Sequence, residues 1–383
     1  MRGIDLHIGI VTFPISQAGV IPLANLIAVL SPLSSELYLI TGGAGYSFFA
    51  ENRNVHLYAV EHRARGQVTF TRAVDYVWTQ LRISRQIMRL ARNVNLWIFF
   101  IGGEGLVLPM LTAKLLGRGA VVASAGSGLK VAQARGDPLA KVAALLQGIT
   151  YRLSDRIIMY SEKLVDEHGL QKYRNKISIA KKHFIDFAKF KAKRKFDDRD
   201  NLVGYIGALT RVKGVPNLLE AIPRVLAEKS DVKFVIGGDG ELKGEVEKYL
   251  AEENLNSKAG YVGWIPHDEL PDCLNKLRLL VLPSYTEGLP NIVLEAMACG
   301  TPVLATAVGG IPDVITDDET GFIMENNSPE CIAMDIIRAL KHPHLAQMAH
   351  NASSLIEREY TYEKAVERYR NILVNLVGTT GIT

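Results

Sequence analysis

The sequence predicts an α/β protein made of two doubly wound halves, each with a parallel sheet between layers of helices. Three observations lead to this fold class. The 383 residues are more than one ordinary hydrophobic core accommodates. Short apolar runs alternate with longer amphipathic stretches along the chain, which is typical of repeated strand and helix units. The alternation lapses at residues 181–200, where charged side chains are dense and a domain boundary is expected.

The predicted strands of the first half are runs of β-branched and aromatic residues that end at glycine or a polar residue. Such runs are apolar on both faces, so they indicate parallel strands covered by helices on both sides. The runs are residues 7–13, 36–41, 55–60, 96–103, 120–124 and 156–161. The apolar window 96–116 contains Glu104 and Lys114, so it favours a strand, a turn and a helix over a membrane span.

The same alternation restarts after the charged segment. The predicted strands of the second half are residues 201–207, 232–238, 259–263, 278–284 and 301–306. We therefore expect a first Rossmann-like domain over residues 1–190 and a second over residues 198–361. A last helical pattern covers residues 362–377.

Composition narrows the functional classes. Hydrophobic residues make up 48% and charged residues 22% of the chain, which indicates a globular protein rather than a disordered one. The net charge of +4 is too small to indicate a nucleic-acid partner. Cys273, Cys299 and Cys331 lack a metal-type spacing, and the N-terminus enters a strand pattern without a signal-peptide pattern. We expect a cytoplasmic protein with free thiols.

Residues 285–310, YTEGLPNIVLEAMACGTPVLATAVGG, contain the strongest functional signal. Glu287 follows an apolar strand, a helix is expected to open at Pro290, and Glu295 lies within that helix. The first turn of a helix has unpaired N–H groups and a partial positive charge, so it favours an anion such as phosphate. Gly288 leaves room for a close approach. The two carboxylates either bind sugar and ribose hydroxyls or remain ordinary solvated charges.

The segment EGLPNIVLEAMACGTPVLAT resembles the donor-site signature of the retaining nucleotide-sugar glycosyltransferases of family 4. The resemblance covers residues 201–375 well and residues 1–180 loosely. It implies a GT-B fold, in which two Rossmann-like domains face a cleft and the helix at 362–377 packs back on the first domain. It also implies transfer of a sugar from a UDP- or GDP-sugar to a glycan, lipid-linked sugar or lipid, with retention of configuration and without a metal or other cofactor.

The resemblance also assigns residues to the donor site. Glu287, Lys213 and Arg211 are the catalytic candidates, because the two cations would neutralise the diphosphate. The donor-binding candidates are Gly207, Gly19, Gly238, Gly240, Ile265, Gly288, Leu289, Pro290, Asn291 and Glu295. The family's usual arginine position is Ala208 here, so Arg211 either supplies the guanidinium or stays in solvent. Trp264, beside Ile265, either stacks on the base or belongs to the core.

The acceptor side is less well defined. A histidine that family members often carry after the strand at 120–124 is missing, which leaves Ser124 and Ser127 as weak candidates. Residues 63–92 combine many arginines with apolar and aromatic residues. They form either a helix that lies on an anionic membrane or an ordinary helix with an apolar core face and a solvated arginine face.

Two other patterns are interpreted as unrelated to catalysis. Residues 198–200, DRD, match the two-aspartate pattern of metal-using transferases, but we expect a solvated charge run without metal. Residues 42–47, GGAGYS, do not complete the G-x-G-x-x-G pattern that a nicotinamide-dependent dehydrogenase needs. Two alternatives to a transferase remain: a sugar-nucleotide epimerase or hydrolase of the same fold, and a non-catalytic subunit that binds a sugar nucleotide.

Overall fold

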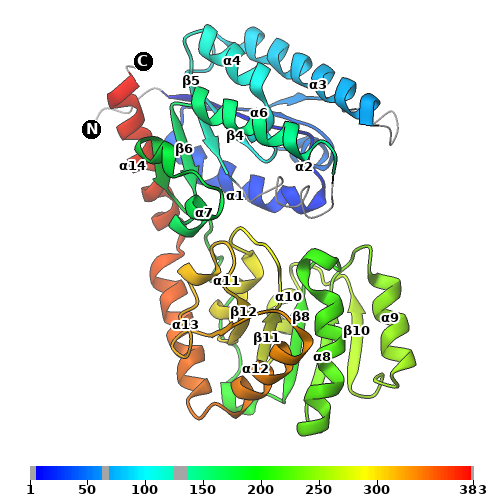
Figure 1. Cartoon of the computed structure of the whole chain (residues 1–383). Coiled ribbons are helices and arrows are strands. Elements are labelled where there is room, and N and C mark those ends of the chain that lie inside the picture. The colour runs from blue at the N-terminus through cyan, green and yellow to red at the C-terminus, as the bar shows by residue number, and fades with distance from the viewer. Residues whose placement is uncertain (1–5, 63–68, 125–136, 381–383) are drawn as a thin grey trace. The chain divides into compact units, whose positions relative to one another are not determined.

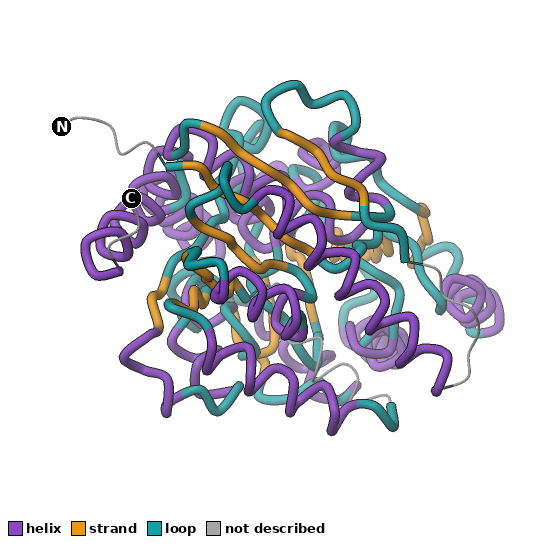
Figure 2. The backbone as a smooth tube through the Cα atoms, turned by 90° about the horizontal axis from the view of Figure 1, so that it is seen from above, coloured by secondary structure: helices purple, strands orange, loops and turns teal. Residues whose placement is uncertain are grey.

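The computed structural model describes residues 6–62, 69–124 and 137–380 (Figure 1). Contacts divide the chain into two compact units, Met1–His183 with Glu363–Thr383, and Phe184–Tyr362. The chain therefore leaves the first unit at His183, a few residues before the predicted end of the first domain. Strands and helices alternate along the backbone (Figure 2). Each unit contains one parallel sheet, one of seven strands and one of six, which confirms the predicted α/β fold class.

The sheet of the first unit has the strand order β3-β2-β1-β4-β5-β6-β7, and every neighbouring pair is parallel. Its strands are β1 His7–Thr12, β2 Glu36–Thr41, β3 His56–Ala59, β4 Leu96–Phe100, β5 Gly119–Ala123, β6 Arg156–Met159 and β7 Ile177–Ile179. The first six agree with the predicted runs. The edge strand β7 was not predicted, because its three residues, Ile-Ser-Ile, are too few to show a period.

The helices of the first unit form two groups. They are α1 Val20–Leu30, α2 Ala44–Phe49, α3 Thr69–Leu90, α4 Val107–Leu115, α6 Ala140–Leu153, α7 Glu162–Glu167 and α14 Tyr362–Thr380. Helices α1 and α2 contact each other, whereas α4 contacts both α3 and α6 (Figure 1). Helix α14 belongs to this unit although it follows the whole second unit in sequence, and its side chains Ala365, Tyr369 and Leu376 are fully buried.

The sheet of the second unit has the strand order β10-β9-β8-β11-β12-β13, again with parallel neighbours. Its strands are β8 Leu202–Ile206, β9 Lys233–Gly237, β10 Ala259–Gly263, β11 Leu279–Leu282, β12 Val303–Thr306 and β13 Phe322–Met324. The first five agree with the predicted runs, and the three-residue β13 was not predicted.

Two hydrophobic cores lie on the two faces of this second sheet. The helices are α8 Val215–Glu228, α9 Lys243–Glu252, α10 Leu270–Leu274, α11 Asn291–Ala298, α12 Pro329–Lys341 and α13 Leu345–Glu359. Successive side chains of a strand point to opposite faces, so Leu279 and Val281 of β11 join the core under α8, α9 and α12. Leu280 and Leu282 join the core under α10, α11 and α13. The β11 residues are apolar throughout because both faces are covered.

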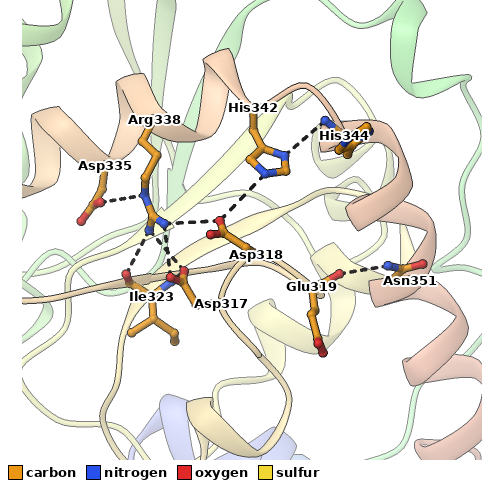
Figure 3. A network of polar contacts seen from close by, with 9 residues as sticks. All are labelled: Asp317, Asp318, Glu319, Ile323, Asp335, Arg338, His342, His344 and Asn351. Carbon is orange, nitrogen blue, oxygen red and sulfur yellow. Dashed lines mark hydrogen bonds and ion pairs between the residues drawn. The ribbon is translucent and has the colours of Figure 1, made fainter.

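A polar network holds α12 to the loop before β13 (Figure 3). The guanidinium of Arg338 lies 3.1 Å from Asp335, 3.2 Å from Asp317 and 3.3 Å from Asp318, and it donates a hydrogen bond of 3.2 Å to the carbonyl of Ile323. A planar guanidinium has enough donors to satisfy several acceptors at once. This network fixes the C-terminal part of α12 against the edge of the sheet.

Within the described ranges, no helix combines the length and the apolar character that crossing a bilayer requires. Cys299 and Cys331 are buried, Cys273 is half-buried, and all three are free thiols.

Candidate donor site at the edge of the second sheet

The order of the strands identifies where a ligand would bind in the second unit. The chain runs outward from β8 to β9 and β10, then returns to place β11 on the other side of β8. The loops after β8 and β11 therefore lie beside each other at the carboxyl edge of the sheet. In open parallel sheets, ligands bind at this switch point, outside the carboxyl ends of the strands. Lys213 follows β8 and Glu287 follows β11, so the two residues lie on neighbouring loops at the switch point.

Lys213 and Glu287 form a close charged contact at this switch point. Lys213 Nζ lies 2.6 Å from Glu287 Oε1, and Ser284 donates its hydroxyl to the same oxygen at 2.8 Å. The Glu287 side chain is only 7% exposed, whereas that of Lys213 is 28% exposed. Burial and the charge of Glu287 raise the pKa of Tyr205 well above its usual range.

Backbone contacts fix the two loops to each other. The amide of Tyr285 donates to the carbonyl of Val212 at 2.9 Å. Gly214 has φ 72°, and a Cβ there would lie 2.1 Å from the carbonyl oxygen of Pro283. The left-handed conformation and this close approach both require glycine. The relative position of Lys213 and Glu287 is thus set by main-chain packing.

Glycines also bring the loop after β9 close to the loop after β8. Gly238 has φ 131°, and a Cβ there would lie 1.8 Å from the carbonyl oxygen of Gly207. Gly240 has φ 157°, and its Cβ would lie 2.5 Å from the carbonyl oxygen of Leu209. Ala208 is exposed, and its carbonyl accepts the hydroxyl of Tyr205 at 2.7 Å. The predicted donor-binding glycines 207, 238 and 240 therefore lie together beside the loop that carries Lys213.

Helix α11 begins one residue later than expected. It starts at Asn291, and Pro290 is its N-cap with an extended backbone, so the expectation that the helix opens at Pro290 is wrong by one position. Proline fits this N-cap because its φ of −71° is compatible with an extended backbone. Its nitrogen also carries no hydrogen that would need an acceptor. Leu289 is buried under the loop, and Gly288 accepts a 2.5 Å hydrogen bond from Gly310.

Glu295 is a buried residue of α11 and has a partner that the sequence did not suggest. Its Oε1 lies 3.1 Å from His267 Nε2, and the pKa of His267 is raised by this hydrogen bond. The interpretation of Glu295 as a solvated helix-surface charge is therefore wrong. His267 lies 28 residues earlier in the chain, so no local spacing relates the two residues.

Three other predicted residues lie apart from the Lys213–Glu287 pair. Arg211 is exposed and its guanidinium lies 3.2 Å from Glu245 of α9. Ile265 is half-buried and packs against Gly237 at the end of β9. Trp264 is 70% exposed, so the interpretation of Trp264 as a core aromatic is wrong. Its indole is accessible to a stacking partner.

The remaining candidates belong to the first unit. Gly19 ends a short 3₁₀ helix after β1, where a Cβ would touch Ile15 at 3.0 Å. Ser124 is buried directly after β5. Ser127 lies outside the described residues.

The DRD pattern at 198–200 is only partly a solvated charge run. Asp198 and Asp200 are exposed, but Arg199 is buried, so that part of the expectation is wrong. Arg199 donates to the carbonyl of Leu277 at 3.0 Å, to the carbonyl of Cys299 at 2.7 Å and to the hydroxyl of Thr301 at 2.7 Å. Arg199 thus ties the segment before β8 to the second core through three neutral acceptors.

Comparison with known proteins places these features in a family. Residues 186–355 match the family of glycosyl transferases group 1. The alpha-D-kanosaminyltransferase of Streptomyces kanamyceticus is 31% identical over 177 residues, 46% of each chain. The N-acetyl-alpha-D-glucosaminyl L-malate synthase of Bacillus anthracis is 24% identical over 387 residues, 97% of each chain. The structure of Anabaena HepE in complex with UDP-glucose has a TM-score of 0.73 at 15% identity and covers 96% of this chain and 99% of its own.

These similarities support different statements. The chain spans about half the length of several curated relatives that it matches, 45% to 47%. The likeness to HepE, at 15% identity, concerns the fold alone and confirms the predicted GT-B class. The family match includes the loop of Lys213, the glycine turns after β8 and β9, Glu287, and α11 with Glu295. Residues 186–355, less than half of the chain, match the glycosyl transferases group 1, and the segment that resembles the family 4 donor site lies within them.

Proposed function

We propose that the chain transfers a sugar from a nucleoside diphosphate sugar to a hydroxyl group of an acceptor. The observation that carries this proposal is the pair of Lys213 and Glu287, 2.6 Å apart at the switch point of the second sheet. One residue has the charge that a diphosphate needs, and the other has the acceptor oxygens that sugar hydroxyls need.

In this proposal the leaving diphosphate lies between Lys213 and the N-terminus of α11. The ammonium group and the positive end of the helix both stabilise the negative charge that grows on the leaving oxygen. Gly288 and the glycines after β8 and β9 leave room for the phosphates. Arg211 would have to break its ion pair with Glu245 before it could contact the diphosphate. We therefore assign Arg211 a role in capturing the donor and not in the site without a donor.

Glu287 is proposed to accept hydrogen bonds from the hydroxyls of the transferred sugar. When the diphosphate binds Lys213, the ammonium is shared and Glu287 keeps the hydrogen bond from Ser284. Glu295 is proposed to accept from a ribose hydroxyl, with His267 as its fixed partner. Trp264 is exposed beside Ile265, where a base could stack on it.

The proposed reaction is substitution at the anomeric carbon. The bond from this carbon to the diphosphate oxygen breaks, and its electron pair goes to the leaving group. The acceptor hydroxyl forms the new bond from the same face, and its proton goes to the departing phosphate, so configuration is retained. The transition state has oxocarbenium character. Lys213 therefore acts on the leaving group, and no side chain of the second unit needs to act as a general base.

We also propose that α3 contacts an anionic membrane surface. Phe70 and Trp78 are exposed on this helix. The alternative of an ordinary helix with a solvated arginine face does not account for these two exposed aromatic side chains. Arg85 and Arg89 are exposed as well, whereas Asp75, the single acid in the sequence of α3, is buried. Apolar and cationic side chains on one helix favour binding at the interface of anionic lipids. Co-sedimentation with vesicles that is independent of anionic lipid content would contradict this contact.

Donor binding is tested first, by thermal denaturation with UDP-glucose, UDP-N-acetylglucosamine and GDP-mannose. UDP-glucose comes first because HepE was solved with it, and GDP-mannose because a relative from Corynebacterium glutamicum is named as GDP-mannose-dependent. A ligand at 100 times its dissociation constant adds about 2.7 kcal/mol to the free energy of unfolding. No shift with any nucleotide sugar would remove the proposal.

Transfer is tested with a radiolabelled donor and a membrane extract. We expect label on an acceptor, and we expect Lys213→Ala and Glu287→Ala each to lower turnover by about 10² or more. Lys233→Ala is the matched control, because Lys233 is exposed at the opposite end of the sheet, at the start of β9. Label that appears as an epimer or as free sugar would instead identify an epimerase or a hydrolase. Donor binding without any product would identify a binding subunit.

A further inference from the structure

A cavity of about 1080 Å³ lies wholly within the first unit. It is placed at the switch point of the first sheet, where β1 and β4 are neighbours and the chain continues from them in opposite directions. Phe13 follows β1, and Gly102 and Glu104 follow β4; all three line the cavity. Ile101, between β4 and Gly102, has φ 34°, a strained backbone of the kind that occurs at functional sites. The volume reaches the upper end of the usual range for ligand pockets.

The walls of the cavity are apolar side chains of three adjacent helices. Those from α3, α4 and α6 include Val77, Val107, Leu108, Val142 and Leu146. Val77 is 47% exposed and Val142 is 51% exposed, so the apolar lining continues to the opening. A hydrocarbon chain gains from every methylene that it buries against these apolar side chains.

The surface beside the opening is apolar too. Phe70 and Trp78 on α3 and Leu145 on α6 are exposed, and each lies within seven residues of a cavity-lining residue on its own helix. Exposed apolar side chains near a cavity are typical of a contact with a membrane or an apolar ligand. The lining also includes one charged pair near solvent, Arg72 and Asp137, whose side chains lie 2.7 Å apart.

One group in the cavity wall has unused hydrogen-bonding capacity. Gln147 donates to Glu104 Oε2 at 2.9 Å, but the buried Glu104 Oε1 has no hydrogen-bond partner among the described residues. The other polar side chains of the wall are engaged: the hydroxyl of Tyr76 donates to the carbonyl of Gly105, and Gln80 accepts the amide of Leu108. Burial raises the pKa of Glu104, and the neighbouring polar side chains of Ser124, Tyr151 and Gln147 offset part of this rise. A ligand hydroxyl at this position would satisfy the free carboxyl oxygen.

We propose that this cavity holds the hydrocarbon chain of an amphiphilic acceptor, and that Glu104 accepts a hydrogen bond from a hydroxyl of that ligand. That the ligand is an acceptor rests on the proposed transferase function. That the ligand has a hydrocarbon chain rests on the cavity alone. It narrows the acceptor from any hydroxyl compound to one with a single long apolar chain, either straight like an acyl chain or branched like an isoprenoid. Under this proposal the principal acceptor is an amphiphile and not a water-soluble glycan.

The test measures binding of chain alcohols to the full-length protein by titration calorimetry. The probes are 1-hexanol, 1-octanol and 1-decanol for straight chains, and geraniol for isoprenoid chains. We expect affinity to rise by about fourfold at most for each added methylene, because each one buries one more CH₂ group in the cavity. Preference for 1-decanol or for geraniol identifies the kind of chain. Failure of both to bind, or affinity that is independent of chain length, overturns the inference.

Two substitutions locate the binding. Ala143 of α6 lines the cavity and its neighbour Ala144 does not, so Ala143→Phe should weaken 1-decanol binding at least tenfold and Ala144→Phe should not. Val142→Asp is a second variant at an exposed rim position, which the fold tolerates, and its charge should also weaken binding at least tenfold. Unchanged binding in Ala143→Phe and Val142→Asp would place the alcohol elsewhere and refute the site.

The same preparations are titrated with UDP-glucose, because this separates the two proposals. Nucleotide binding without alcohol binding removes the cavity inference and leaves the transferase proposal in place. Alcohol binding at the cavity without any nucleotide binding removes the transferase proposal and leaves an apolar ligand site. Loss of alcohol binding in Ala143→Phe with normal nucleotide binding supports both.

Discussion

Replacing Lys213 by methionine is the most informative single change in the donor site. Methionine keeps much of the length and apolar volume of lysine but removes the ammonium group. Glu287 would then keep only the hydrogen bond from Ser284 while its side chain stays 7% exposed. The substitution therefore tests how much the chain depends on the pair when no donor is bound.

The expected loss follows from the geometry. At a separation of 2.6 Å and an effective dielectric constant of about 20, the attraction is about 6 kcal/mol. Removing two ions from water offsets most of this attraction, and breaking a fully buried pair costs about 3 to 5 kcal/mol. Lys213 is 28% exposed, so solvent reduces the loss. We expect Lys213→Met to lower the free energy of unfolding by about 2 kcal/mol.

Urea denaturation of four proteins measures this loss: the unsubstituted chain, Lys213→Met, Glu287→Gln and the double variant. Glu287→Gln alone leaves a partly exposed cation and should cost less than Lys213→Met. In the double variant no charge is left unpaired, so its stability should return to within about 1 kcal/mol of the original. A Lys213→Met protein as stable as the original, or additive losses in the double variant, would refute the reasoning about a buried pair.

Three further outcomes are expected. Arg199→Met should lower the free energy of unfolding by about 2 to 4 kcal/mol, because three buried acceptors lose their donor. Gly238→Ala should destabilise strongly or prevent folding, since the new Cβ would lie 1.8 Å from the carbonyl oxygen of Gly207. The pKa of His267 is raised above 6.5 by Glu295, so the stability from this pair is complete below pH 6.5 and is lost as pH rises through the raised value. His267→Gln should remove less than about 1 kcal/mol of the difference in the free energy of unfolding between pH 6 and pH 8, because solvent screens the half-exposed imidazole.

Matched variants control these measurements. Arg194→Met removes an exposed guanidinium five residues before Arg199 and should change stability little. Gly244→Ala adds a Cβ in α9 where no atom lies within 4 Å, so it should stabilise by about 0.5 to 1 kcal/mol. Glu295→Gln should abolish the same pH dependence as His267→Gln. Retention of that dependence in either variant would mean that another group titrates.

Most of the fold could be predicted because parallel strands buried on both faces are continuous apolar runs. Eleven of the thirteen named strands correspond to such runs, and the two missed, β7 and β13, have three residues each. Strands this short show no period. Their position depends on pairing with β6 and β12, which is long-range information that a local pattern lacks.

The donor site was predictable where function and local sequence coincide. Lys213, Glu287 and the glycine turns stand at the ends of strands, so strand prediction alone brings them to one edge of the sheet. Partners that are distant in sequence were missed. Arg199 looked like part of a surface charge run because its acceptors, at 277, 299 and 301, come from other elements. Glu295 was named as a donor-binding candidate, but its partner His267 was missed because it comes from another element of the fold.

The return of α14 to the first unit affects how the chain is made. The ribosome completes residues 184–362 before it synthesises α14, so the second unit can fold as one continuous stretch. The nascent first unit must wait with an uncovered apolar surface for Tyr369, Leu376 and their neighbours. A premature stop near residue 361 would leave that surface permanently open to aggregation, whereas an excised fragment of the second unit would lose none of its own core.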